Sequence, residues 1–189
     1  METVIEPTTA RKPRFASAWL GGCSGCHMSF LDIDEWIIDL ANMVDIVYSP
    51  VVDIKNFPED VDVALVEGAV ANEDNLEVLL QIRKNSKLLI AFGDCAVTGN
   101  VTAMRNPLGT ATDILKSVYV DSTDMQQQIP SRQHILPVLM EKVRPLHEVV
   151  KVDAYLHGCP PSAADIRKAL EQVLAGTPEL IKESKAKFG

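Results

Sequence analysis

The sequence has no uninterrupted apolar stretch approaching the roughly 20 residues that a membrane-spanning helix needs. It also lacks a stripe of Lys and Arg, and its formal net charge of −8 repels nucleic-acid phosphates and anionic lipid headgroups. No apolar run of signal-peptide length follows the basic residues near its start, and we find no internal repeat and no interdomain linker. We therefore expect a cytoplasmic protein with no nucleic-acid partner and no membrane partner.

The composition is that of a globular domain. With 189 residues and 47% hydrophobic content, the chain can bury roughly 70% of its unfolded surface in one domain without cross-links. It contains only four cysteines. In the reducing cytoplasm, metal binding or catalysis explains them better than structural disulfides do.

Apolar runs that are typical of strands alternate along the chain with stretches that have helical spacing. The expected strands are residues 14–20, 44–49, 61–68, 87–93 and 151–158. The expected helices are residues 29–42, 72–84 and 161–176, with a further candidate in 135–150. Because such alternation builds parallel sheets, we predict an α/β fold with a doubly wound parallel sheet of four to five strands in a single domain.

The domain is expected to span residues 13–180, between a loose N-terminal tail of residues 1–12 and a C-terminal tail of residues 181–189. The least regular part is 99–134. Within it, residues 121–133 lack apolar periodicity, which indicates an exposed loop or a contact with a partner.

The four cysteines all lie just beyond predicted strands: Cys23, Cys26, Cys95 and Cys159. In an open parallel sheet, the carboxyl ends of the strands share one edge, where such folds bind their ligands. A glycine stands next to or close before each cysteine, so the backbone can approach a bulky group there. The four thiols can thus meet at one site.

Three explanations compete for these thiols. Cysteines are often simply buried, but this does not explain why all four follow strands. A thioredoxin-like thiol oxidoreductase would use Cys23 and Cys26 and leave Cys95 and Cys159 without a role. A four-thiolate metal site uses every cysteine, for zinc or for an iron–sulfur cluster. Ligands scattered over a sheet edge favour the larger [4Fe–4S] cluster over zinc.

Four segments carry a family resemblance: "WLGGCSGCHMSFLD" (19–32), "VALVEGAV" (63–70), "AFGDCAVTGN" (91–100) and "VVKVDAYLHGCPPSAADI" (149–166). In combination they resemble the small subunit of [NiFe] hydrogenases, most closely that of the cytoplasmic NAD-reducing enzymes. The segments include all four cysteines.

The resemblance implies a flavodoxin-like domain in which Cys23, Cys26, Cys95 and Cys159 hold one proximal [4Fe–4S] cluster. It also implies an oxidoreductase complex in which a separate large subunit carries the Ni–Fe centre. Electrons then pass through this chain to the flavin and iron–sulfur subunits of a diaphorase module, so no bond-making catalysis is expected on this chain.

Two departures from the family narrow the hypothesis. Many small subunits have a second, cysteine-rich domain and a twin-arginine signal, and neither is found here, so we expect one cluster and a soluble enzyme. The related complex I-type cluster subunit has adjacent cysteines where this chain has "CSGC", which argues against that alternative.

Several further residues have open roles. Glu67, at the end of a predicted strand, is either a surface acid or a proton relay at the subunit boundary. His27 and His157 flank cysteines and are expected to neighbour the cluster rather than to ligate it.

Asp32, Asp34 and Glu35 are interpreted as acids at the start of a helix. The turn "GGCSG" could also hold the phosphate of FMN, as flavodoxin-like folds do, but cysteines occupy the place of a Ser/Thr-rich phosphate loop. FMN on this chain is therefore the disfavoured alternative.

Overall fold

The computed structural model describes residues 11–122, 124, 127–132 and 135–176. The strands are β1 (Arg14–Trp19), β2 (Asp45–Tyr48), β3 (Val61–Glu67), β4 (Val70–Asn72), β5 (Ser86–Phe92), β6 (Leu139–Arg144) and β7 (Ala154–Leu156). The helices are α1 (Gly25–Leu31), α2 (Trp36–Met43), α3 (Glu73–Asn85), α4 (Asp94–Thr98), α5 (Asn100–Ala103), α6 (Ala111–Lys116) and α7 (Ala163–Leu174). Further helical turns, which are not α-helical, are η1 (Asn106–Leu108), η2 (Ser117–Asp121) and η3 (Leu146–Glu148).

Five of these strands form one parallel sheet in the order β2-β1-β3-β5-β7. This is the order of flavodoxin-like folds, and the expected doubly wound sheet is confirmed. The register aligns the carboxyl ends of the strands, because Trp19 pairs with Glu67, Glu67 with Phe92, and Phe92 with Leu156. The loops that follow these four strands therefore all begin at the same edge of the sheet.

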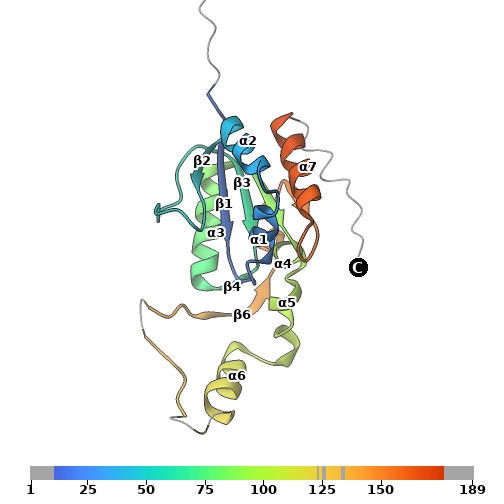
Figure 1. The fold of residues 1–189 in the computed structure, drawn as a ribbon. Helices are drawn as coiled ribbons and strands as arrows, with labels where there is room; N and C mark the ends of the chain where they lie inside the picture. The colour runs from blue at the N-terminus through green and yellow to red at the C-terminus, as the bar shows by residue number, and fades with distance from the viewer. Residues whose placement is uncertain (1–10, 123, 125–126, 133–134, 177–189) are drawn as a thin grey trace, which may run out of the picture.

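Helices cover both faces of the sheet (Figure 1). Helices α1, α2 and α7 pack on one face, where Leu40, Leu65 and Ile166 are almost fully buried. Helices α3 and α4 pack on the other face, where Leu79 and Ile82 are fully buried. Burying each such side chain contributes about 1.5–3 kcal/mol. Because both faces are covered, the central strands are apolar along almost their whole length.

Local capping signals fix the start of α3 as the sequence indicates. The side chain of Asn72 accepts a hydrogen bond from the backbone N–H of Asn75 at 2.8 Å. Glu73 and Asp74 occupy the first turn, where carboxylates interact favourably with the helix dipole.

Between α4 and β7 the chain leaves the sheet, and we call the described part of residues 99–144 the arm. Figure 1 shows β4 and β6 crossing below the main sheet, with α5 and α6 extending away from it. The guanidinium of Arg105 donates hydrogen bonds to the carbonyl oxygens of Ala71 and Met140, so it ties the start of η1 to the antiparallel β4–β6 pair.

One predicted helix is divided in two in the structure, and one is replaced by a strand. Residues 29–42 form two helices, α1 and α2, separated by a turn at 32–35 in which Asp34 has a φ of 51°. The candidate helix in 135–150 is instead strand β6 followed by η3, because this segment pairs with β4. Pro145, at which the expected helix would have to end, lies between β6 and η3.

The expected tails, 1–12 and 181–189, lie outside the described residues except for 11 and 12. Within the described part of the chain, no helix is both long enough and apolar enough to cross a membrane.

Candidate functional site

The four cysteines lie at the carboxyl edge of the sheet, as predicted. Cys23 follows β1 and Cys26 lies in the first turn of α1, while Cys95 lies in α4 after β5 and Cys159 follows β7. All four are free thiols, with Cys26 and Cys95 buried and Cys23 and Cys159 exposed. The site is therefore half covered by protein and half open to a partner or to solvent.

Hydrogen bonds hold the three cysteine-bearing segments together. The backbone N–H of Asp94 donates to the carbonyl oxygen of Gly158 at 2.9 Å, and the Gly158 N–H donates to the Asp94 carboxylate at 2.8 Å. The hydroxyl of Ser29, in α1, donates to the carbonyl oxygen of Pro161 at 2.6 Å. These bonds link the segments after β1, β5 and β7.

The thiols are close enough to influence one another's ionisation. Burial raises the pKa of Cys26, and the nearby charges of Glu67 and of the other three cysteines raise it further. Burial also raises the pKa of Cys95, although N–H groups of the arm act in the opposite direction. Four thiolates therefore repel one another here unless a cation holds them.

Glycine at position 93 makes room for the site. Gly93 has a φ of 82°, and a Cβ atom there would collide with the Sγ atom of Cys26. Two N–H groups also reach sulfur, since the Gly25 backbone donates to Cys23 at 3.4 Å and the Asn100 side chain donates to Cys159 at 3.2 Å. N–H donors of this kind commonly surround thiolates that bind iron.

The donor set suits a sulfur-ligated group. Within the described residues, no three or more His, Cys, Asp or Glu side chains are arranged to hold a metal ion. Thiolate is nevertheless the ligand that iron–sulfur clusters use in proteins. The ligation of a [4Fe–4S] cluster by these four cysteines stays a prediction.

Glu67 lies behind the cysteines and is buried, with 1% of its surface exposed, so it is not a surface acid. Its carboxylate accepts hydrogen bonds from the backbone N–H groups of Cys26 at 3.4 Å and His27 at 3.0 Å. The same carboxylate contacts Nδ1 of the His27 ring. Glu67 thus joins the end of β3 to the start of α1. The sequence gives no sign of this pairing, and a proton path through Glu67 stays a prediction.

The two histidines have different surroundings. The buried His27 ring lies edge-on to Trp19 and Phe92, and its Nε2 atom has no hydrogen-bond partner. His157 is half-buried and stacks on Tyr155, with ring centroids 6.5 Å apart.

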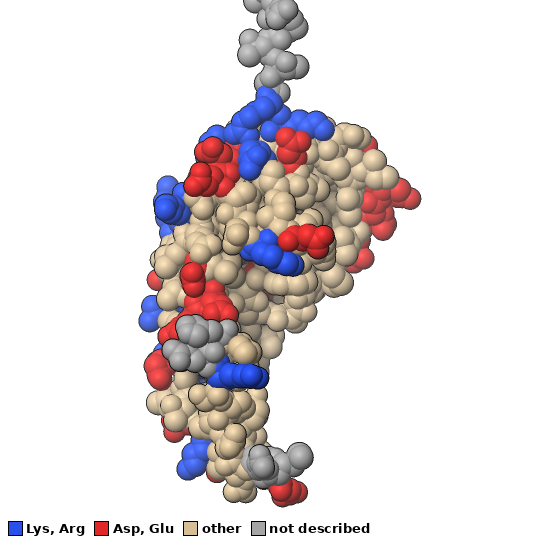
Figure 2. Space-filling view, turned by 90° about the vertical axis from the view of Figure 1, so that its left-hand side faces the viewer, with Lys and Arg blue, Asp and Glu red and all other residues tan. Residues whose placement is uncertain are grey.

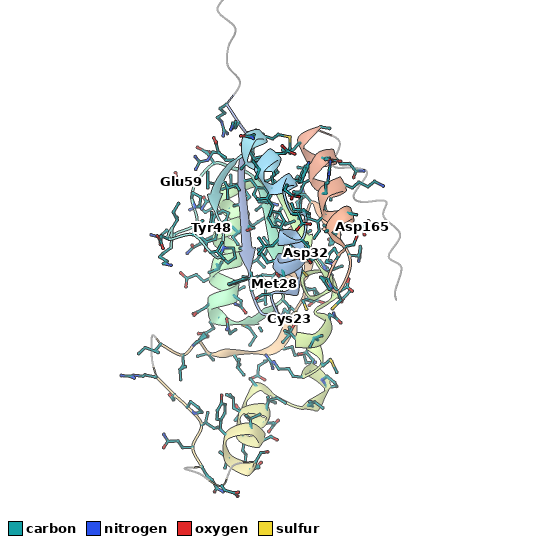
Figure 3. The ribbon with its side chains drawn as sticks, viewed as in Figure 1. Cys23, Met28, Asp32, Tyr48, Glu59 and Asp165 are labelled. Atoms are coloured by element: carbon teal, nitrogen blue, oxygen red, sulfur yellow. The ribbon has the colours of Figure 1, made fainter. Side chains whose placement is uncertain are left out.

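Of the three acids interpreted as helix-start residues, Glu35 lies at the start of a helix, and Asp32 and Asp34 lie before it. Asp32 caps the carboxyl end of α1, Asp34 lies in the following turn, and Glu35 precedes α2. All three are exposed. Figure 3 labels Cys23, Met28 and Asp32 in succession on the side of the molecule where α1 lies.

A cavity of about 210 Å³ lies beside the carboxyl ends of β1 and β2, with Trp19, Tyr48 and Asn75 in its lining. Small-molecule sites commonly measure about 300–1,000 Å³. None of the four cysteines lines this cavity. FMN stays the disfavoured alternative on this chain.

Comparisons with known proteins converge on redox complexes. The sequence model of a family described as "NADH ubiquinone oxidoreductase, 20 Kd subunit" matches residues 23–173. The delta subunit of the NAD-reducing hydrogenase HoxS from Cupriavidus necator is 38% identical over 184 residues, which cover 94% of this chain and 86% of the relative.

One subunit of the F420-non-reducing hydrogenase vhu from Methanocaldococcus jannaschii is 40% identical over 159 residues, or 83% of this chain. The match covers 54% of that relative, so the chain spans about half of its length. Among solved structures, the crystal structure of an NAD+-reducing [NiFe]-hydrogenase in the H2-reduced state contains a chain with a TM-score of 0.84 and 40% identity. The match covers 94% of this chain and 97% of that one.

Proposed function

The chain belongs to the family of the 20 Kd subunit of NADH ubiquinone oxidoreductase and, within that family, to the small subunits of [NiFe] hydrogenases, and we propose from this that it transfers electrons in an NAD-reducing hydrogenase. It is a subunit of an enzyme complex and makes no bonds itself. The gathering of four free cysteines at one sheet edge carries the proposal.

In this proposal Cys23, Cys26, Cys95 and Cys159 hold one [4Fe–4S] cluster as thiolates. When bound, the cluster supplies a centre that takes up and releases an electron. Because burial raises the pKa of Cys26 and Cys95, both thiols have to lose protons as they bind iron, and iron binding therefore strengthens as the pH rises. The covering protein excludes water from these two sulfurs, while Cys23 and Cys159 face outward.

The proposed partners are a large subunit with the Ni–Fe centre and the flavin and iron–sulfur subunits of a diaphorase module. Electron transfer weakens steeply with distance, so a partner has to lie against the cysteine edge. Exposed apolar side chains lie at the end of β1 and along α1, which starts at this edge: Trp19, Met28 and Leu31. Water solvates such apolar surface poorly. We assign this surface, which we call the α1 surface, to the large subunit.

The surface charge gives no support to a nucleic-acid partner. On the face shown in Figure 2, basic and acidic side chains are interspersed, and no continuous basic stripe crosses it. The net charge of −8 also disfavours binding to nucleic-acid phosphates. The four free thiols and the resemblance to the NAD-reducing enzyme support a cytoplasmic location.

Iron and sulfide analysis of the anaerobically purified chain tests the proposal. We expect a brown sample with about four irons and four sulfides assigned to this chain. Serine at Cys95 or Cys159 should remove that iron and its absorption. A colourless wild-type chain with one zinc would contradict the proposal.

Two alternatives have separate outcomes in the same experiment. A thiol oxidoreductase that uses Cys23 and Cys26 would reduce insulin disulfides, and serine at Cys95 or Cys159 would leave that activity intact. A complex I-type subunit would hold the cluster but would copurify with quinone-reducing partners. The hydrogenase relatives, at 38% and 40% identity, favour the hydrogenase role.

A further inference from the structure

One side chain outside the four cysteines reaches a ligand sulfur directly. The Nδ2 atom of Asn100 donates a hydrogen bond to the Sγ atom of Cys159 at 3.2 Å, across 59 positions of sequence. A thiolate that binds iron has no proton to donate, so only the NH2 end of the amide can face it favourably.

The backbone around Asn100 is shaped to place this amide. Gly99 ends α4 with a φ of 84°, and Asn100 follows with a φ of 34°. Two successive residues with positive φ turn the chain sharply from α4 into α5. Asparagine tolerates this region better than most residues that have a Cβ atom. The turn thus favours a residue that also carries the amide donor.

The N–H donors that reach the sulfurs of Cys23 and Cys159 differ in kind. The Gly25 donor to Cys23 belongs to the backbone, whereas the Asn100 donor to Cys159 belongs to a side chain. A substitution can therefore remove the Asn100 donor and leave the backbone in place.

An N–H donor withdraws negative charge from a ligand sulfur. The reduced cluster carries one more negative charge than the oxidised cluster, so the donor stabilises the reduced form more and raises the reduction potential. We propose that Asn100 is a positioning residue that holds Cys159 and raises the potential of the cluster through this hydrogen bond. The inference depends on the proposed function, because it requires a cluster at the four cysteines.

The test is a redox titration of the complete complex, followed by the electron paramagnetic resonance signal of the reduced cluster. Asn100→Ala and Asn100→Asp both remove the donor, and Asp keeps the shape of the side chain. Both should lower the potential, by up to about tenfold in the equilibrium constant for reduction, or about 59 mV for one electron. The resonance Raman band of the bond between iron and the Cys159 sulfur should shift as well.

A third variant separates the hydrogen bond from the backbone strain. Asn100→Gly accepts the positive φ but has no amide, so it should show the same lowered potential as Asn100→Ala. Thr98→Ala removes a hydroxyl from α4 that bonds to the carbonyl oxygen of Asp94, and it should keep the wild-type potential.

Three results would overturn the inference. The first is an Asn100→Ala variant that retains its iron and has the wild-type reduction potential. The second is a wild-type potential in Asn100→Gly while the potential of Asn100→Ala is lowered. The third is loss of iron from all three Asn100 variants. Iron and sulfide counts on the wild-type chain keep the two proposals apart. If the wild-type chain lacks a four-iron cluster, the proposed function fails. If it holds a cluster whose reduction potential does not change when Asn100 is replaced, only this inference fails.

Discussion

Asp94 and Gly158 are joined by two hydrogen bonds of 2.9 and 2.8 Å, and these bonds clamp the loop after β5 to the loop after β7. Each loop brings one cysteine, Cys95 or Cys159, to the site. The carboxylate of Asp94 therefore helps to hold these two cysteine-bearing loops side by side.

Replacement of Asp94 by Ala should loosen the clamp. The Gly158 N–H then loses an acceptor that is charged, which costs about 1.5–3 kcal/mol of unfolding free energy. Urea denaturation of the purified chain should show that loss, and iron content should fall. Asp94→Asn keeps an acceptor oxygen and should be milder, while alanine at the exposed Asp53 should change neither quantity.

Replacement of Gly93 by Ala should be more damaging than the same change at another glycine with positive φ. Both Gly93 and Gly176 have positive φ, 82° and 75°, so alanine is strained at each by about 1–3 kcal/mol. Only at Gly93 would the new Cβ atom meet the Cys26 sulfur, whereas nothing lies within 4 Å at Gly176. Gly93→Ala should therefore also lose iron, and equal iron contents in the two variants would refute the proposed crowding.

Acid should weaken the tie between β5 and β7. Burial by itself raises the pKa of Asp153, but hydrogen bonds from the Leu89 N–H and from the Arg83 guanidinium outweigh it, and the pKa is lowered overall. A lowered folded-state pKa means that this stabilisation is present above the unfolded pKa of about 3.9 and is lost as the pH falls through the folded value.

Asp153→Asn should therefore reduce the unfolding free energy by about 1.5–3 kcal/mol at pH 7, and the gap to wild type should narrow below about pH 4. Urea midpoints at several pH values measure the gap. Lys151→Ala serves as a control, because Lys151 is 83% exposed and its ion pair with Asp153 contributes little. A constant gap down to pH 2 would contradict this explanation.

A charge on the α1 surface should block assembly. Met28 is 50% exposed at the cysteine edge, and Leu80 is equally exposed on α3, across the sheet. Met28→Glu should reduce copurification of the large subunit at least tenfold, since burying an unpaired carboxylate is costly. Leu80→Glu should assemble normally. Equal recovery of the large subunit from both variants would place the interface elsewhere.

Glu67→Gln tests both roles of this buried carboxylate. The amide has one acceptor oxygen in place of two, so it leaves an N–H of Cys26 or His27 unsatisfied at a cost of about 1–3 kcal/mol. Urea denaturation measures that cost. If Glu67 also carries protons, the complex should exchange H2 with D2O more slowly at unchanged iron content; an unchanged exchange rate would leave Glu67 with the structural role alone.

The sequence predicts the sheet well because β3 and β5 are buried on both faces and therefore consist of long apolar runs that are visible in the sequence. It predicts the cysteine edge because the position of each thiol after a strand is a local feature. It fails where pairing with a segment far away in the sequence determines the secondary structure, as in β6, which is a strand because it pairs with β4. It also fails at residues 32–35, where a turn interrupts continuous helical spacing.

The contacts of the site beyond its cysteines were not predictable for the same reason. Glu67 meets His27 across 40 positions, and Asn100 meets Cys159 across 59. Neither pair has a spacing that a local pattern could report. Only the fold brings each pair together.

Among the described strands, β7 is the last to be synthesised and the outermost on its side of the sheet, and it delivers Cys159. A ribosome-bound chain that has emerged only as far as α4 presents three thiols and no fourth. If the proposed cluster binds these four cysteines, its set of ligands is complete only after translation has passed position 159, so cluster loading would follow synthesis of almost the whole described domain.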